Sequence, residues 1–320
     1  MPKTIPYVLQ KYTNHSDTSN PSQLSNQFLD SRIAKYLQKK KYKVERTYVI
    51  HGKKINITLY FFKKMAKLSI ELILKKIYLL LLLFFNEASV NVNINIYFTH
   101  FKKYMPPTSE FTSYHVNSGV CSFGGPVNEI TIYREEEWFK VLIHEMFHAL
   151  NFDDKFSEYV HPDIVDRFNI QNLKLFGETY VELWATIYNV MISVFLSKQP
   201  FLKYVDQYLQ KEFMHSIDQN KKILAKNNTT YEAEIAKPKF IHLEKQNLLY
   251  YYVFKMILFY KLNDFLQICK SDNHILQLNK DKTTKLLDVI VKTYKHPALV
   301  RLIKHKRLRK TRNLRMTITR

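Results

Sequence analysis

The chain has 320 residues but only two cysteines and five glycines. Cys121 and Cys269 lie far apart, so the sequence predicts no disulfide framework and favours a reducing, cytoplasmic compartment. The longest apolar run, residues 77–85, is shorter than the roughly 20 residues that a membrane span needs, so we expect a buried helix and no span. Residues 1–26 are polar, lack the apolar core of a signal peptide and are expected to form a loose arm.

Acidic residues are also scarce, with 28 Asp and Glu against 49 Lys and Arg and a formal net charge of +21. Such a charge favours anionic partners: nucleic acid, anionic lipid or acidic protein. Residues 301–320 contain no acidic residue and are expected to form a basic tail. This tail is either a solvated segment without a specific function, a nuclear-targeting signal or a weak polyanion-binding site. The candidate polyanion-binding residues are Lys304, Lys306, Arg307, Arg309, Lys310 and Arg312.

With 22 Tyr and 22 Phe, the chain can bury a substantial core. Hydrophobic periodicity predicts an α+β fold, in which strands and three helices come first and an all-helical half follows. Val and Ile alternate with Asn over residues 90–98, which indicates a strand with one buried face. The other predicted strands are residues 42–50, 55–62, 119–123 and 129–133, and the predicted helices are 27–41, 65–85, 135–151, 173–196, 201–218 and 243–269.

The most informative feature is the motif from His144 to His148, His-Glu-Met-Phe-His, set in an apolar stretch. Two histidines four residues apart project from the same side of a helix, so both imidazoles can bind one Zn²⁺. The adjacent Glu145 can then take a proton from a water that the metal activates. In the alternative interpretation, the histidines are merely hydrogen-bonded in a core. Residues 135–137 are three glutamates, expected in the first turn of this helix, where they suit its dipole.

A catalytic zinc needs a third protein ligand, and three candidates follow the motif. Glu178 begins a polar and small-residue stripe on an apolar helix, and the preceding Gly177 would let two backbones come close. Glu182 lies one turn further along the same stripe. Asp154 is the third candidate, because Asn151 between it and the motif tolerates the left-handed conformation that such a turn needs. Another residue, such as His161, is the remaining alternative.

The motif followed by an acidic helix resembles the gluzincins, a group of zincin-fold zinc metallopeptidases. That resemblance implies an upper subdomain with a twisted sheet (residues 27–152), a helical lower subdomain (153–300) and an active-site cleft between them. It implies Glu178 as the ligand and Glu182 as the residue that orients His144. The spacer before Glu178 is longer than in many gluzincins, and Gly177 replaces their usual Asn. Asp154 instead fits the metzincin spacing.

The resemblance further implies a peptide or protein substrate, aligned along an edge strand near Gly119. An oxyanion donor is also expected, and the candidates are Tyr250, Tyr251, Tyr252 and His242. The chain is also similar to uncharacterised predicted metallopeptidases of large DNA viruses, which implies a location in host cytoplasm or virion; the basic tail leaves the nucleus open. The rival hypothesis is a non-catalytic basic scaffold or nucleic-acid-binding protein on a degenerate zincin core.

Overall fold

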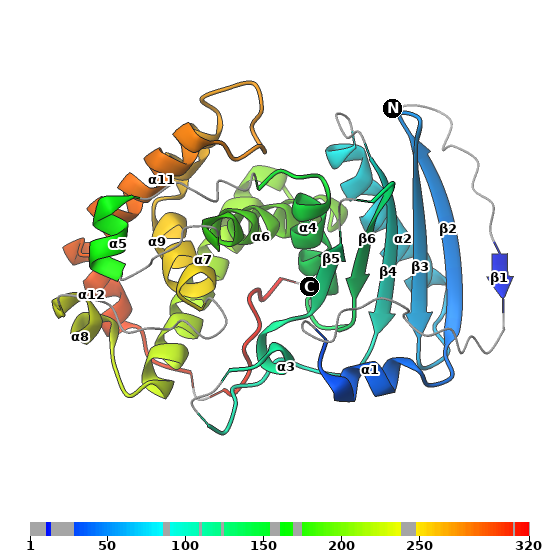
Figure 1. Cartoon of the computed structure of the whole chain (residues 1–320), viewed down its shortest axis with the longest axis horizontal. Helices are drawn as coiled ribbons and strands as arrows, with labels where there is room; N and C mark the ends of the chain where they lie inside the picture. Colours follow the sequence, from blue (N-terminus) through cyan, green and yellow to red (C-terminus); the bar gives the residue numbers. More distant parts are fainter. Residues whose placement is uncertain are drawn as a thin grey trace. The chain divides into compact units, whose positions relative to one another are not determined.

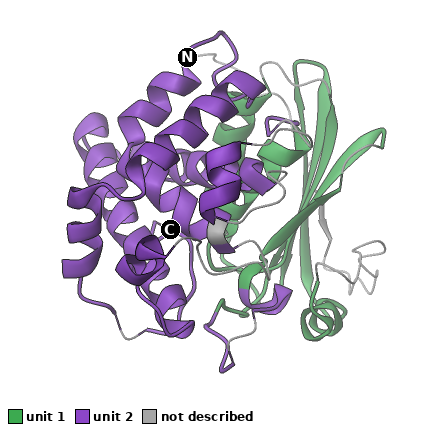
Figure 2. Ribbon diagram, turned by 60° about the vertical axis from the view of Figure 1, so that its left-hand side comes forward, with its two compact units in different colours: residues 1–103, 116–150 green, residues 104–115, 151–320 purple. Residues whose placement is uncertain are grey.

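The computed structural model describes residues 11–13, 29–85, 90–108, 111–122, 125–153, 161–168, 175–237, 248–309 and 311–319. The chain divides into two compact units, coloured separately in Figure 2. Unit 1 comprises Met1–Lys103 and Val116–Leu150, and unit 2 comprises Tyr104–His115 and Asn151–Arg320. Most of the expected N-terminal arm lies outside the described residues, but Lys11–Thr13 form strand β1.

Unit 1 contains a mixed sheet with the strand order β1-β2-β3-β4-β6-β5 (Figure 1). The strands β3, β4 and β6 run parallel to one another, and β1, β2 and β5 pair antiparallel with their neighbours. Strand β5 ends the sheet, as predicted for the strand near Gly119. The bounds are β2 Tyr42–Ile50, β3 Lys53–Phe61, β4 Asn91–Phe98, β5 Gly119–Ser122 and β6 Val127–Ile132.

The predicted hairpin between β2 and β3 is confirmed. His51 and Gly52, which connect the strands, have φ values of 48° and 76°. Two successive left-handed residues are what a two-residue hairpin turn with the twist of the flanking strands requires. Glycine at the second position adopts this conformation without a steric penalty.

The buried face of the sheet comes from the alternation that the sequence predicts. In β4, Val92, Ile94 and Ile96 are fully buried, whereas the intervening asparagines are half-buried. Strand register places Ile94 beside Ile57 of β3 and Ile130 of β6, and all three are at most 1 % exposed. The core of unit 1 is therefore a continuous aliphatic layer across the three parallel strands.

Helices α2 (Lys67–Phe84) and α4 (Trp138–Ala149) lie together in unit 1, where the Phe84 and Phe147 rings meet edge to face at 5.3 Å. Helix α2 also contacts β2, through an ion pair from Glu71 and a ring stack from Tyr78. It therefore packs against the sheet. The two short helices are α1 (Ser31–Leu37) and α3 (Ser113–Val116).

The described part of unit 2 is almost wholly helical, as predicted. The prediction of one helix over residues 243–269 is wrong. The described part of this range, residues 248–269, forms three segments, η2, α9 and α10. The bounds are α5 Pro162–Phe168, α6 Phe176–Leu196, α7 Phe201–Lys226, α8 Tyr231–Ala236, η2 Leu249–Phe254, α9 Lys255–Tyr260, α10 Leu262–Cys269, α11 Lys280–Thr293 and α12 Pro297–His305. The π-helical η2 carries three consecutive tyrosines, and such turns are frequent at functional sites.

Helix α6 is the central helix of unit 2. By length and composition it is, among the described residues, the one helix that could cross a membrane, but 72 % of its apolar window is buried inside the protein. Buried core helices have the same length and composition. Helix α6 contacts α7, η2 and α9, which surround it within the unit.

The C-terminal segment of unit 2, residues 313–319, is not a solvated tail. Leu314, Thr317 and Thr319 are at most 7 % exposed. The buried Glu212 carboxylate of α7 accepts hydrogen bonds from the hydroxyl groups of Thr317 and Thr319, both at 2.6 Å, and from two backbone N–H groups. In the expected basic tail, the described residues 307–309, 311 and 312 are exposed, and they lie between α12 and this anchored end.

Candidate metal centre

The motif helix α4 begins later than predicted. Its first residue is Trp138, and the three glutamates expected in the first turn precede it. Glu137 instead adopts a left-handed conformation with φ 60° at the helix N-cap, where its buried carboxylate lies 3.5 Å from the Lys103 ammonium. Sequence reasoning missed this pair, because the two residues are brought together only by tertiary structure.

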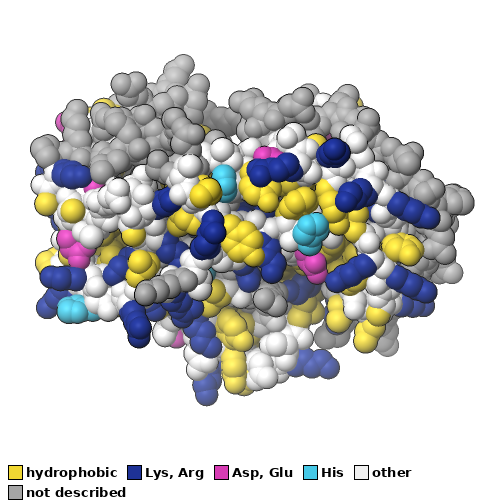
Figure 3. All heavy atoms as spheres, turned by 90° about the horizontal axis from the view of Figure 1, so that it is seen from below, with side chains coloured by type: hydrophobic (Ala, Val, Ile, Leu, Met, Phe, Trp, Pro, Cys, Tyr) yellow, Lys and Arg dark blue, Asp and Glu magenta, His cyan; other side chains and the backbone are white. Residues whose placement is uncertain are grey.

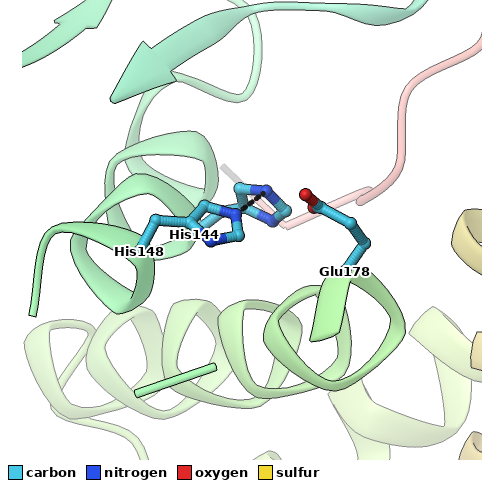
Figure 4. A group of neighbouring side chains, drawn as sticks. All are labelled: His144, His148 and Glu178. Carbon is cyan, nitrogen blue, oxygen red and sulfur yellow. Dashed lines mark hydrogen bonds between the residues drawn. The ribbon is translucent and has the colours of Figure 1, made fainter. Parts of the chain in front are cut away.

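The two motif histidines face one another across one turn of α4. Their Nε2 atoms lie 3.1 Å apart, and the rings meet at 4.8 Å between centroids (Figure 4). Two zinc–nitrogen bonds of about 2.05 Å at a tetrahedral angle would separate their nitrogens by about 3.3 Å. The observed spacing therefore fits two ligands of a single zinc ion.

Glu145 is held next to these histidines with little freedom. His144 and Glu145 are each 8 % exposed. Strand β5 begins so close that a Cβ on Gly119 would lie 2.9 Å from a Glu145 carboxylate oxygen and 2.8 Å from a Val141 methyl group. Any side chain at position 119 would displace one of them, so glycine is needed for this close approach.

Tyr133 lies close enough to Glu145 for the carboxylate charge to act on its phenol. Sequence reasoning missed this pair. Burial raises the pKa of the Tyr133 phenol well above its ordinary value; nearby Arg134 opposes this shift and the Glu145 carboxylate adds to it. A phenol whose pKa is raised stays neutral at physiological pH. Tyr133 therefore adds no negative charge beside the Glu145 carboxylate.

Glu178 joins the two histidines in a group that could hold a metal ion. One ligand atom from each of the three residues lies within 4.8 Å of the others (Figure 4). Two imidazoles and one carboxylate are a donor set that catalytic zinc uses. Gly177 precedes Glu178, and a Cβ there would lie 3.2 Å from the Asp153 carbonyl oxygen, which confirms the predicted close approach of two backbones.

The tyrosine run in η2 supplies a partner to Glu178. The Tyr251 hydroxyl donates a hydrogen bond of 2.7 Å to the Glu178 carboxylate. Its neighbours serve the core: burial raises the pKa of Tyr250, and the Tyr252 hydroxyl donates to the Leu314 carbonyl oxygen at 3.4 Å. Of these three oxyanion candidates, Tyr251 is therefore the one placed at the group; His242 lies outside the described residues.

Glu182 lies one turn beyond Glu178 on α6 in a different environment. It is 1 % exposed, and its carboxylate lies 3.6 Å from the Lys255 ammonium of α9. Lys255 also donates to the Met316 carbonyl oxygen at 3.3 Å, which links the pair to the C-terminal segment. Among the described residues, the group that could hold a metal ion contains Glu178 and not Glu182. Sequence reasoning missed Lys255, since no local spacing relates it to α6.

Other candidates from the sequence fall elsewhere. Asn151 adopts the predicted left-handed conformation, with φ 57°, but Asp154 lies outside the described residues. His161, a further conceivable ligand, lies 3.2 Å from the Asp288 carboxylate. Cys121 is half-buried on β5, and its Sγ lies 3.8 Å from the Ser122 carbonyl oxygen.

The basic stretch remains accessible. Lys304, Arg307, Arg309 and Arg312 are exposed, Lys306 is half-buried, and Lys310 lies outside the described residues. Figure 3 shows Lys and Arg side chains spread over one face of the molecule, with few acidic groups among them. Arg309 Nε lies 3.2 Å from the buried Asp218 carboxylate, so part of its charge is compensated within unit 2.

Comparison with known proteins adds no family. No family model matches the chain, and no curated protein or solved structure matches it. Any functional conclusion therefore depends on the chemistry of the His144, Glu145, His148 and Glu178 group itself.

Proposed function

We propose that the protein is a zinc-dependent metallopeptidase of gluzincin type, with His144, His148 and Glu178 as the ligands of one zinc ion. The observation that carries the proposal is the convergence of two imidazoles and a carboxylate within 4.8 Å, with the histidine nitrogens 3.1 Å apart.

Zinc, when bound, would polarise the substrate carbonyl and lower the pKa of a water molecule. Glu145 follows the ligand His144 directly and is nearly buried. Its carboxylate accepts a proton from the attacking water and then delivers that proton to the nitrogen of the leaving amine. General acid–base transfer of this kind contributes about 10² to 10⁴ in rate.

Tyr251 acts on the same site through Glu178. Its hydrogen bond fixes the orientation of the carboxylate, so fewer conformations are lost when a metal is bound. Through this hydrogen bond the Tyr251 hydroxyl lies beside the Glu178 carboxylate. In the proposed mechanism, the hydroxyl also donates a hydrogen bond to the developing oxyanion.

The proposal includes a zincin arrangement of the sheet and the motif helix. A sheet ending in an antiparallel edge strand beside the motif helix supports it, since β5 begins against Glu145. A peptide or protein substrate would pair with β5 through backbone hydrogen bonds. The proposal also includes an active-site cleft, a similarity to viral metallopeptidases and a cytoplasmic or virion location.

A second candidate function is favoured by the exposed basic stretch. Lys304, Arg307 and Arg312 offer cations for weak polyanion binding, with nuclear targeting as the alternative. A non-catalytic basic scaffold would bind a polyanion through these residues, and Glu145 would then have no catalytic role.

The test of the metallopeptidase proposal is Glu145→Gln. The variant should bind one zinc ion as tightly as the wild type, because both histidines and Glu178 remain. Peptide cleavage should fall by about 10³-fold or more, because the proton acceptor is lost. Zinc content and turnover of a quenched peptide library measure both effects, and unchanged turnover would rule out the mechanism.

A further inference from the structure

Helix α2 presents an apolar face to solvent. Leu68 is 74 % exposed, Leu72 57 %, Leu82 45 % and Leu83 53 %. These are unusually open positions for leucine, and they gather on a single helix. Contiguous exposed apolar side chains of this size mark an interaction site more often than a scattered single residue does.

Helical spacing puts these leucines on one side of α2. Leu68, Leu72 and Leu83 are separated by four and eleven residues, which brings them to the same face, and Leu82 flanks it. The opposite face is fully used in the core of unit 1, through Ile70, Leu74, Ile77, Leu81 and Phe84. The outward leucines therefore do not contribute to the fold of the sheet and its helices.

The charge around this face is almost wholly positive. Lys63, Lys64, Lys67 and Lys75 are exposed at its start and along it. The half-buried Lys76 lies with its ammonium 5.0 Å from the centre of the Phe139 ring. The one acidic residue of the helix, Glu71, is 3.3 Å from Arg46 of β2, so its charge is already compensated.

We propose that this α2 face, Leu68, Leu72, Leu82 and Leu83 with Lys63, Lys64, Lys67 and Lys75, binds an anionic membrane surface. Leucines on one stripe with lysines beside them are the composition of interfacial helices, in which the leucines enter the acyl boundary. The lysine stems lie along apolar surface while their ammonium groups reach the lipid phosphates and carboxylates.

The composition argues against a protein partner. Protein interfaces are enriched in aromatic residues and Arg and depleted in Lys, whereas the exposed part of this face has leucines and lysines. An anionic lipid surface complements it in both respects, because it offers apolar depth and negative charge together.

Vesicle co-sedimentation tests the proposal and needs no metal or peptide substrate, so its failure is separate from failure of the metallopeptidase proposal. We expect the full chain to bind phosphatidylcholine vesicles containing phosphatidylserine, and to bind pure phosphatidylcholine at least tenfold more weakly. Binding should weaken as salt is raised, over the range in which surface charges are screened.

Two sets of variants separate the apolar and the charged contributions. Combining Leu68→Gln, Leu72→Gln and Leu83→Gln should reduce the partition coefficient at least tenfold. Single Lys→Gln changes at 64, 67 or 75 should each reduce it about fivefold, the effect of one cation near an anionic surface. The matched control is Leu202→Gln on α7, which alters an equally open leucine (82 % exposed) and should change nothing. Circular dichroism confirms folding, and Leu68→Gln alone serves if the triple variant does not fold.

Three results would overturn the proposal. One is equal binding to neutral and anionic vesicles. A second is loss of binding on Arg307→Gln with Arg312→Gln while the α2 variants bind normally, which would assign the lipid to the basic stretch. The third is the absence of vesicle binding together with a dimer that the leucine variants dissociate, which would assign the face to a second copy.

Discussion

Helices α4 and α6 each carry two candidate residues four positions apart. The two residues share one environment on α4 but have different partners on α6. On α4, His144 and His148 share one environment, with their nitrogens 3.1 Å apart. On α6, Glu178 joins the histidine group, whereas Glu182 is paired with Lys255. Spacing predicts which residues share a helix face, but contacts from other elements decide what each residue does.

The largest effect that tests this contrast concerns stability. Glu182→Ala leaves Lys255 buried without its carboxylate, and breaking a buried pair in this way costs about 3–5 kcal/mol. Both side chains are 2 % exposed, so solvent screens little of this cost. Urea unfolding of the metal-free protein measures it. Glu178→Ala is the control, which should cost less because that residue is half-buried; equal costs for the two variants would contradict the distinction.

The next effect concerns the partner of Glu178. Tyr251→Phe removes the 2.7 Å hydrogen bond to the Glu178 carboxylate and should weaken zinc binding about 10- to 100-fold. Competition with a chelator measures the affinity. Tyr252→Phe, whose hydroxyl donates to Leu314 instead, should leave zinc affinity unchanged. If both variants lost affinity equally, η2 would act through packing and not through Glu178.

The smallest effect concerns the position of Glu145. Gly119→Ala places a methyl group where the Glu145 carboxylate and Val141 now lie, so it should shift the carboxylate and lower turnover about tenfold with zinc retained. Gly125→Ala is the matched control in the same unit, because its nearest neighbour would be at 3.7 Å, an ordinary contact. Turnover that is equal in the two variants would show that Glu145 tolerates the displacement.

Much of the fold follows from local patterns. The hairpin at His51 and Gly52, the alternation in β4 and the long helix α6 agree with the sequence, since each depends on neighbours a few residues away. The motif histidines converge for the same reason. Such features need no knowledge of the tertiary structure.

The rest depends on distant residues. Glu137 lies at the N-cap of α4 and not in its first turn, with its carboxylate 3.5 Å from the Lys103 ammonium. The C-terminal segment is folded because the buried Glu212 accepts hydrogen bonds from two hydroxyl and two backbone N–H groups of Thr317 to Thr319. Lys255 likewise reaches Glu182 from a helix more than 70 positions later. No hydrophobic period or motif encodes these pairings, because each joins residues that meet only after folding.

Zinc affinity in two single variants tests the central claim most directly. Glu178→Gln should bind zinc at least about 100-fold more weakly than the wild type, because one of three ligands loses its charge. Glu182→Gln should retain near-normal zinc affinity, because that side chain is paired with Lys255. Normal zinc binding by Glu178→Gln, with loss of zinc from Glu182→Gln, would contradict the ligand assignment and the site built on it.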